Sequence, residues 1–137
     1  MPVLHLHDGT KMYESNAIFR YLGKIYKGRK EETLYPGADD PDLTFAIDDV
    51  LETCEALIPK FRGFLNPNIP DYKDKEKHFD DFKKTHFPKF LETMENKLKK
   101  NDDKYIATDH MTLADIAVAS HLLRAAYNEQ FEDRGSL

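Results

Sequence analysis

The feature that most constrains this chain is a long apolar stripe over residues 43–61. Its apolar residues recur at steps of three and four, the spacing of one face of an α-helix. The members of the stripe are Leu43, Ile47, Val50, Leu51, Cys54, Leu57, Ile58 and Phe61. The stripe predicts a long amphipathic helix over residues 43–64, which starts after a loop rich in Gly, Pro and Asp at residues 28–42.

A second stripe predicts another long helix over residues 71–100. Its members are Phe79, Phe82, Phe87, Phe90, Leu91, Met94 and Leu98. Pro88 lies inside this stripe, and we expect it to kink the helix because its ring removes a backbone donor.

A capping motif predicts a third helix over residues 112–128. The hydroxyl of Thr112 can accept from the backbone N–H three residues on, and the carboxylate of Asp115 can accept from the N–H of Thr112. Met111 and Ile116 are spaced as a hydrophobic staple around this start.

The first 27 residues predict a β-hairpin followed by a helix. Leu4 and Leu6 alternate with histidines, so the leucines should face inward and His5 and His7 outward. Asp8-Gly9 is a hairpin turn signal, and Ser15 is placed to cap the helix that follows. Because a two-stranded sheet is marginal alone, we expect either disorder here or cover from a partner.

Composition limits the classes of function. The chain has 137 residues, which predicts one domain, and 40% of them are apolar, enough for a core. No stretch approaches the ~20 apolar residues of a membrane span. The formal net charge of −5 argues against nucleic acid as a partner. We therefore expect an α+β, mostly α, cytoplasmic protein with no membrane span and no metal.

Several polar residues have an ordinary structural interpretation. His5 and His7 are expected on a solvated strand face, and Cys54 as a small buried hydrophobe. The acidic helix face formed by Asp48, Asp49, Glu52 and Glu55 is expected to be solvated, as is the mixed-charge segment 97–104.

Motifs in the first part of the chain resemble the second half of the glutathione-binding domain of cytosolic glutathione transferases, with a sigma-like leaning. They are Pro2-Val3-Leu4, Asp8-Gly9, Glu14-Ser15-Asn16-Ala17-Ile18 and Arg20-Tyr21-Leu22-Gly23. Later motifs resemble the family's linker and its helical domain, and these are Leu34-Tyr35-Pro36, Phe87-Pro88-Lys89-Phe90-Leu91 and Thr112-Leu113-Ala114-Asp115-Ile116.

The resemblance implies a domain plan. Residues 1–27 would be a partial thioredoxin-like glutathione-binding domain, residues 28–42 a linker, and residues 43–137 a partial all-α C-terminal domain. Glutathione would be the co-substrate, hydrophobic electrophiles would be the other substrates, and the protein would form a homodimer or join a hetero-assembly.

The resemblance also implies binding residues. Met1 would pair its backbone with the cysteinyl part of glutathione, ahead of a cis Pro2. Glu14 and Ser15 would hold the γ-glutamyl group, where a helix N-terminus favours a carboxylate. Glu52 would reach the glutathione of the partner subunit. Thr112 and Asp115 would form the structural cap.

The family's catalytic hydroxyl or thiol lies at the end of a strand that nothing in this sequence matches, so no catalytic residue is assigned. The last helices of the family are also unmatched. Three alternatives stay open: an incompletely given transferase, a truncated non-catalytic structural subunit, and the transferase-like domain of the elongation-factor-1 gamma subunit. We further expect association, because five side chains should lack partners within the chain: Leu51, Cys54, Ile58, Phe82 and Phe90.

Overall fold

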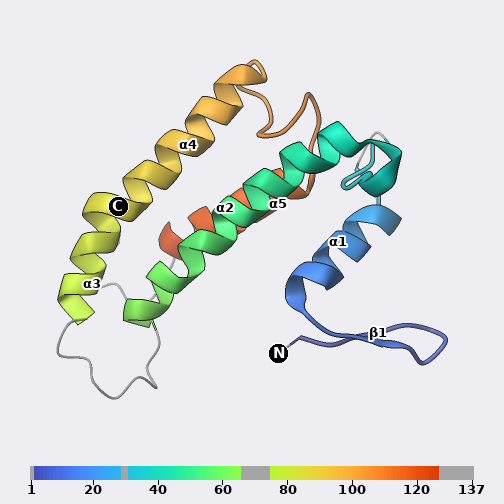
Figure 1. The fold of residues 1–137 in the computed structure, drawn as a ribbon, viewed down its shortest axis with the longest axis horizontal. Coiled ribbons are helices and arrows are strands. Elements are labelled where there is room, and N and C mark those ends of the chain that lie inside the picture. Colours follow the sequence, from blue (N-terminus) through green and yellow to red (C-terminus); the bar gives the residue numbers. More distant parts are fainter. Residues whose placement is uncertain (1, 29–30, 66–74, 127–137) are drawn as a thin grey trace.

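The computed structural model describes residues 2–28, 31–65 and 75–126, which form a hairpin and a set of helices (Figure 1). The elements are β1 (Leu4–His5), β2 (Lys11–Met12), α1 (Ser15–Ile25), a short 3₁₀ helix (Gly37–Asp39), α2 (Pro41–Leu65), α3 (Lys75–Asp81), a π-helical turn (Phe82–His86), α4 (Phe87–Lys100) and α5 (Leu113–Ala126). This arrangement confirms the α+β, mostly α class. Within the described ranges, no helix has both the length and the apolar character needed to cross a membrane.

The hairpin forms as predicted. β1 and β2 pair in antiparallel register, with Leu4 opposite Met12. Leu4 and Leu6 are half-buried, whereas both histidines of this segment are exposed. The turn depends on Gly9, whose φ of 85° suits glycine, and the carboxylate of Asp8 accepts from the N–H of Thr10 at 2.9 Å. In Figure 1 the hairpin lies beside α1, away from α4. Its cover by a partner stays a prediction.

Ser15 does not cap α1, so that prediction is wrong. The N-cap residue is Glu14, which has φ 68° and ψ 111° and whose side chain makes no capping hydrogen bond. Because the chain turns at Glu14, the helix has already begun at Ser15. The first closed turn runs from the N–H of Ile18 to the carbonyl of Glu14, at 3.0 Å.

Helix α2 is the centre of the helical body, and α3, α4 and α5 all pack against it. Leu51, Cys54, Phe82 and Phe90 are buried inside the single chain, and Ile58 is partly buried. The prediction that these side chains lack partners is therefore wrong. The physical reason is that α2 lies between neighbouring helices that cover its apolar stripe on more than one side.

The second predicted helix is interrupted just before Pro88, and the kink expected at Pro88 stays a prediction. The interruption is the π-helical turn just before it, where the N–H of Phe87 donates to the carbonyl of Phe82. Pro88 has no N–H to donate to the carbonyl four residues earlier. The widened π-helical turn lies next to this missing hydrogen bond. Residues 71–74 of the predicted helix lie outside the described residues.

The start of α5 is held by its own motif. The carboxylate Oδ2 of Asp115 accepts from the backbone N–H of Thr112 at 2.8 Å, as predicted. The hydroxyl of Thr112 accepts from the N–H of Ala114, two residues on rather than three. The difference follows from a further bond, because this hydroxyl donates to Asp115 and is pulled toward it. Met111 and Ile116 both stay more than a third exposed.

Helix α1 approaches α5 closely, and a glycine allows it. A Cβ on Gly23 would lie 2.6 Å from a methyl carbon of Leu113. The N–H of Leu113 donates to the carbonyl of Leu34 in the linker, at 3.0 Å. The linker, α1 and the start of α5 therefore meet at one place.

Candidate functional site

A cleft of about 320 Å³ lies between α1, α2 and α5. Its apolar lining consists of Phe19, Leu51, Cys54, Ile116 and Ala117, and its polar lining of Ser15, Asn16, Glu55, Ser120 and His121. The cleft thus joins an apolar floor to polar groups, as small-molecule sites commonly do.

The N-terminus of α1 opens onto this cleft. Ser15 is the first residue of the helix and its side chain is exposed, and Asn16 follows it in the lining. The first N–H groups of a helix have no intrahelical acceptor, and the helix dipole adds positive potential there. This end of the cleft can therefore receive a carboxylate.

Cys54 lies at the floor of the cleft and is 1% exposed. Burial, with a smaller effect from the charge of Glu55, raises the pKa of the Cys54 thiol to about 12. The buried-hydrophobe interpretation is confirmed. Near neutral pH the thiol stays protonated, so Cys54 does not act as a nucleophile in this state.

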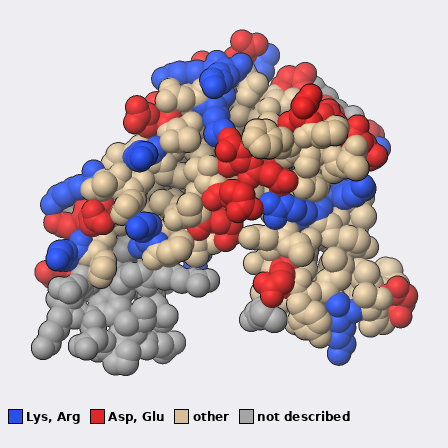
Figure 2. Space-filling view, viewed as in Figure 1, with Lys and Arg blue, Asp and Glu red and all other residues tan. Residues whose placement is uncertain are grey.

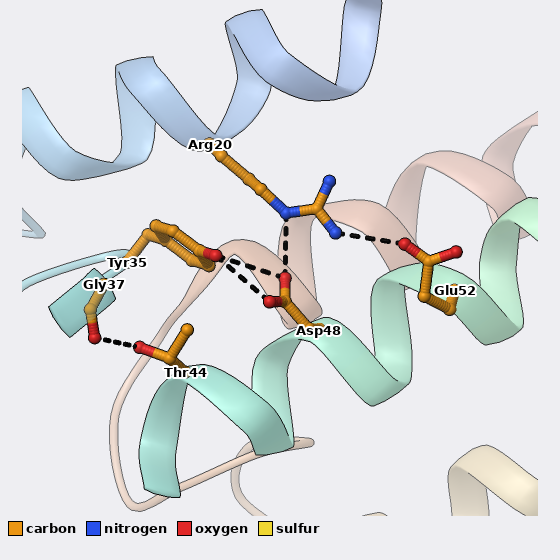
Figure 3. Close-up of polar contacts among 6 residues, drawn as sticks. All are labelled: Arg20, Tyr35, Gly37, Thr44, Asp48 and Glu52. Atoms are coloured by element: carbon orange, nitrogen blue, oxygen red, sulfur yellow. Dashed lines mark hydrogen bonds and ion pairs between the residues drawn. The ribbon is translucent and has the colours of Figure 1, made fainter. Parts of the chain in front are cut away.

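Four side chains beside the cleft form what we call the Arg20 clamp: Arg20, Tyr35, Asp48 and Glu52 (Figure 3). The guanidinium of Arg20 donates through Nε to Asp48 at 2.8 Å and through Nη2 to Glu52 at 3.1 Å. The hydroxyl of Tyr35 donates to the same Asp48 carboxylate at 3.1 Å. The clamp joins α1, the linker and α2.

The clamp shifts the titration of two of its members. Burial raises the pKa of Tyr35, and the hydrogen bond to Asp48 adds to it. Burial lowers the pKa of Arg20, but the hydrogen bond and charge of Asp48 outweigh it, so that the pKa of Arg20 is raised overall. Both shifts keep the protonated donors in place.

The acidic face of α2 is not simply solvated, which corrects the prediction. Asp48 and Glu52 pair with Arg20, and Asp49 pairs with Lys97 of α4. Lys97, expected in a solvated helix end, is three-quarters buried along its side chain. Figure 2 shows acidic side chains gathered in the middle of this face with basic side chains next to them.

A comparison with known protein families shows which family this chain belongs to. A family model, described as the C-terminal domain of glutathione S-transferase, matches residues 59–134, more than half of the chain. The chain belongs to the glutathione S-transferase family. No match was found among curated proteins. The matched region contains α4, α5 and the cap formed by Thr112 and Asp115.

In this glutathione S-transferase family member, the predicted glutathione-binding residues lie outside the matched region and are only partly brought together. Ser15 lines the cleft, and Glu14 is exposed immediately before it. Glu52 faces Arg20 in the clamp, and Pro2 is exposed at the start of the hairpin. Met1 lies outside the described residues, and so does its bond to Pro2.

Sequence reasoning missed several residues of the site. Glu55 was grouped with a solvated face, whereas it lines the cleft. Ser120 and His121 were not singled out for the site, although they follow Ala117 along α5. The ring of His121 is oriented by a 2.8 Å contact between Nδ1 and the carbonyl of Ala117. A helical projection of α5 could have placed Ser120 and His121 on one face, but it could not have shown that this face lines the cleft.

Within the described residues, no group of three His, Cys, Asp or Glu side chains is placed to hold a metal.

Proposed function

We propose that this chain binds glutathione by its γ-glutamyl end at the N-terminus of α1, as one part of a glutathione-conjugating site. The observation that carries the proposal is the position of Ser15, which presents the first turn of a helix to a partly apolar cleft. Membership of the glutathione S-transferase family supports the choice of ligand.

Both charged groups of the γ-glutamyl end have a matching group. The γ-glutamyl carboxylate meets free N–H groups and the hydroxyl of Ser15, while its ammonium group meets the exposed carboxylate of Glu14. The partly apolar cleft next to this end would hold a small hydrophobic electrophile. Glu52 would act on the glutathione of a second subunit, as the family resemblance implies.

Binding can be tested with fragments of the ligand. Calorimetric titration should show weak binding of glutathione and of γ-glutamylcysteine to residues 1–137, and none of cysteinylglycine, which lacks the γ-glutamyl group. Ser15→Ala should weaken glutathione binding by about tenfold to a hundredfold, since a hydrogen bond to a charged group contributes ~1.5–3 kcal/mol. The matched control is Thr85→Ala, because Thr85 is exposed on the π-helical turn outside the cleft lining.

Conjugation is a separate question from binding. The reaction needs a thiolate of glutathione near neutral pH and a donor poised ~3 Å from its sulfur. Cys54 is 1% exposed, and no residue of the predicted binding set has the role of that donor. We therefore expect residues 1–137 alone to leave the rate of glutathione addition to chlorodinitrobenzene at its uncatalysed value.

The outcomes separate the alternatives. Binding without turnover, with turnover gained when an upstream strand is added, supports the transferase proposal. Absence of glutathione binding would favour a non-catalytic structural subunit, including one of the elongation-factor-1 gamma type. Turnover by residues 1–137 alone would mean that the catalytic group has been missed, and Tyr13 would be the first residue to replace.

A further inference from the structure

Apolar burial attaches α1 to the helical body only in part, because most of its apolar side chains are half-buried rather than buried. Of the described residues of α1, only Gly23 is buried, whereas Phe19 is partly buried against the core and Ile25 is more than half exposed. The close contact of Gly23 with Leu113 fixes the C-terminal half of the helix. The half that carries Ser15 therefore needs another attachment.

The Arg20 clamp supplies that attachment. Arg20 lies between the two halves of α1, and its two hydrogen bonds reach positions one turn apart on α2, at Asp48 and Glu52 (Figure 3). The side chains of Arg20 and Asp48 are about three-quarters and two-thirds buried, so this pair is less screened than an ordinary surface ion pair. Because the planar guanidinium donates from two nitrogens to two different carboxylates, it also fixes direction in a way that the single ammonium of lysine does not.

The clamp lies directly beside the cleft. Phe19, the residue before Arg20, lines the cleft from α1, and Leu51, which lies between Asp48 and Glu52 on α2, lines it from the other side. Any movement of α1 away from α2 would thus widen the cleft and uncover the thiol of Cys54 at its floor.

We propose that Arg20 is a positioning residue that sets the width of the cleft through Asp48, and that it thereby sets the affinity for glutathione. The second half of this inference rests on the proposed function, whereas the first half does not. Tyr35 holds the shared carboxylate from the linker side, at 3.1 Å, so the clamp also ties the position of α1 to the segment that accepts from the start of α5.

The test uses Cys54, the only cysteine of the chain, as a reporter. The rate at which an aromatic disulfide labels Cys54 in the folded protein is measured for the parent, Arg20→Gln, Arg20→Lys and Asp48→Asn. We expect Arg20→Gln to label at least roughly fivefold faster than the parent, the factor that corresponds to the loss of one net hydrogen bond. Arg20→Lys should recover part of the protection. The double variant Arg20→Gln/Asp48→Asn should label no more than a further such factor faster than either single variant, because both changes break the same contact.

Two controls separate local opening from general loss of stability. Lys24→Gln removes a positive charge one turn further along α1, where Lys24 makes a 3.9 Å exposed contact with Asp39, and it should label like the parent. Met94→Ala removes a buried side chain of α4 and lowers stability at a position outside both the clamp and the cleft lining. At conditions where its melting temperature equals that of Arg20→Gln, it should label more slowly than Arg20→Gln.

Each result decides one part of the inference. Equal labelling of Arg20→Gln and the parent, or of Arg20→Gln and Met94→Ala at matched stability, overturns the role of the clamp. If Cys54 is labelled faster in Arg20→Gln but this variant binds glutathione as tightly as the parent, the proposed link between cleft width and affinity is wrong. If the parent itself binds no glutathione, the proposed function fails, and the labelling rates still decide whether Arg20 holds the cleft.

Discussion

At the scale of single residues, partners across the helices determine how the polar groups behave. Asp48 would be an ordinary exposed carboxylate on an isolated helix. In the folded chain it accepts from Arg20 and Tyr35 together. Because one carboxylate accepts from two donors, the loss of one donor should change the strength of the hydrogen bond made by the other. The phenol of Tyr35 gives this effect a measurable pH dependence.

The Tyr35 hydroxyl should make stability fall in alkaline solution. Its folded pKa lies above the ordinary value of 10.0, chiefly because of burial and then because of the bond to Asp48. The stabilisation is therefore fully present below pH 10.0 and is lost as pH rises through the folded pKa. Urea unfolding at pH values on both sides of 10.0 should show that the parent loses more stability than Tyr35→Phe does.

The control for this experiment is Tyr26→Phe, since Tyr26 is 62% exposed. That variant should follow the parent at every pH. If the Tyr35→Phe curve runs parallel to the parent curve above the ordinary tyrosine pKa, the phenol is not held as the geometry indicates.

At the scale of elements, the start of α5 joins segments that are distant in the chain. Oδ1 of Asp115 accepts from the N–H of Ile106 at 2.8 Å, in addition to the cap on Thr112 made by Oδ2. The carbonyl of Leu34 accepts a hydrogen bond from the N–H of Leu113. One carboxylate thus caps a helix and also anchors the loop that leads into it.

Asp115→Ala should lower the free energy of unfolding by about 0.5–2 kcal/mol, the range for a lost helix cap. The value should lie toward the upper end, because the N–H of the buried Ile106 also loses its acceptor. Thermal and urea unfolding followed by circular dichroism would measure it. Asp109→Ala, at a 92% exposed aspartate of the same loop, is the matched control and should leave the unfolding curves close to those of the parent. Coincident unfolding curves for Asp115→Ala and the parent would show that the cap carries no stability.

At the scale of the whole molecule, α2 has enough neighbours within the chain to bury its apolar stripe. Association is therefore not required to cover Leu51 or Phe82, and the reason first given for it fails. Large apolar side chains nevertheless remain on the surface, and the most exposed of these in the described chain is Phe45, at 74%. Family membership independently favours a dimer.

We expect sedimentation velocity at micromolar concentration to show a species heavier than the 15.9 kDa chain. Phe45→Glu should shift it toward the monomer, because a charge would replace the most exposed apolar side chain on α2. Leu91→Glu, on α4, is the comparison and should not change the distribution. A monomer at all concentrations in the parent would contradict the prediction.

The sequence alone determined the features that depend on neighbouring residues. The period of the apolar stripe predicted α2, Asp8-Gly9 predicted the hairpin, and the spacing of Thr112 and Asp115 predicted a cap whose carboxylate half is confirmed. Each of these interactions joins residues close together in the chain, so the local pattern contains the information needed to find it.

Only the tertiary structure decided which polar groups meet and which surfaces are covered. Arg20 and Asp48 are 28 positions apart, and Asp49 and Lys97 are 48 apart, so no local spacing pairs them. The capping role expected for Ser15 failed because the turn at Glu14 starts the helix one residue early. The cleft itself exists because α1, α2 and α5 are packed together, and contacts between helices are a property of that packing rather than of any one segment.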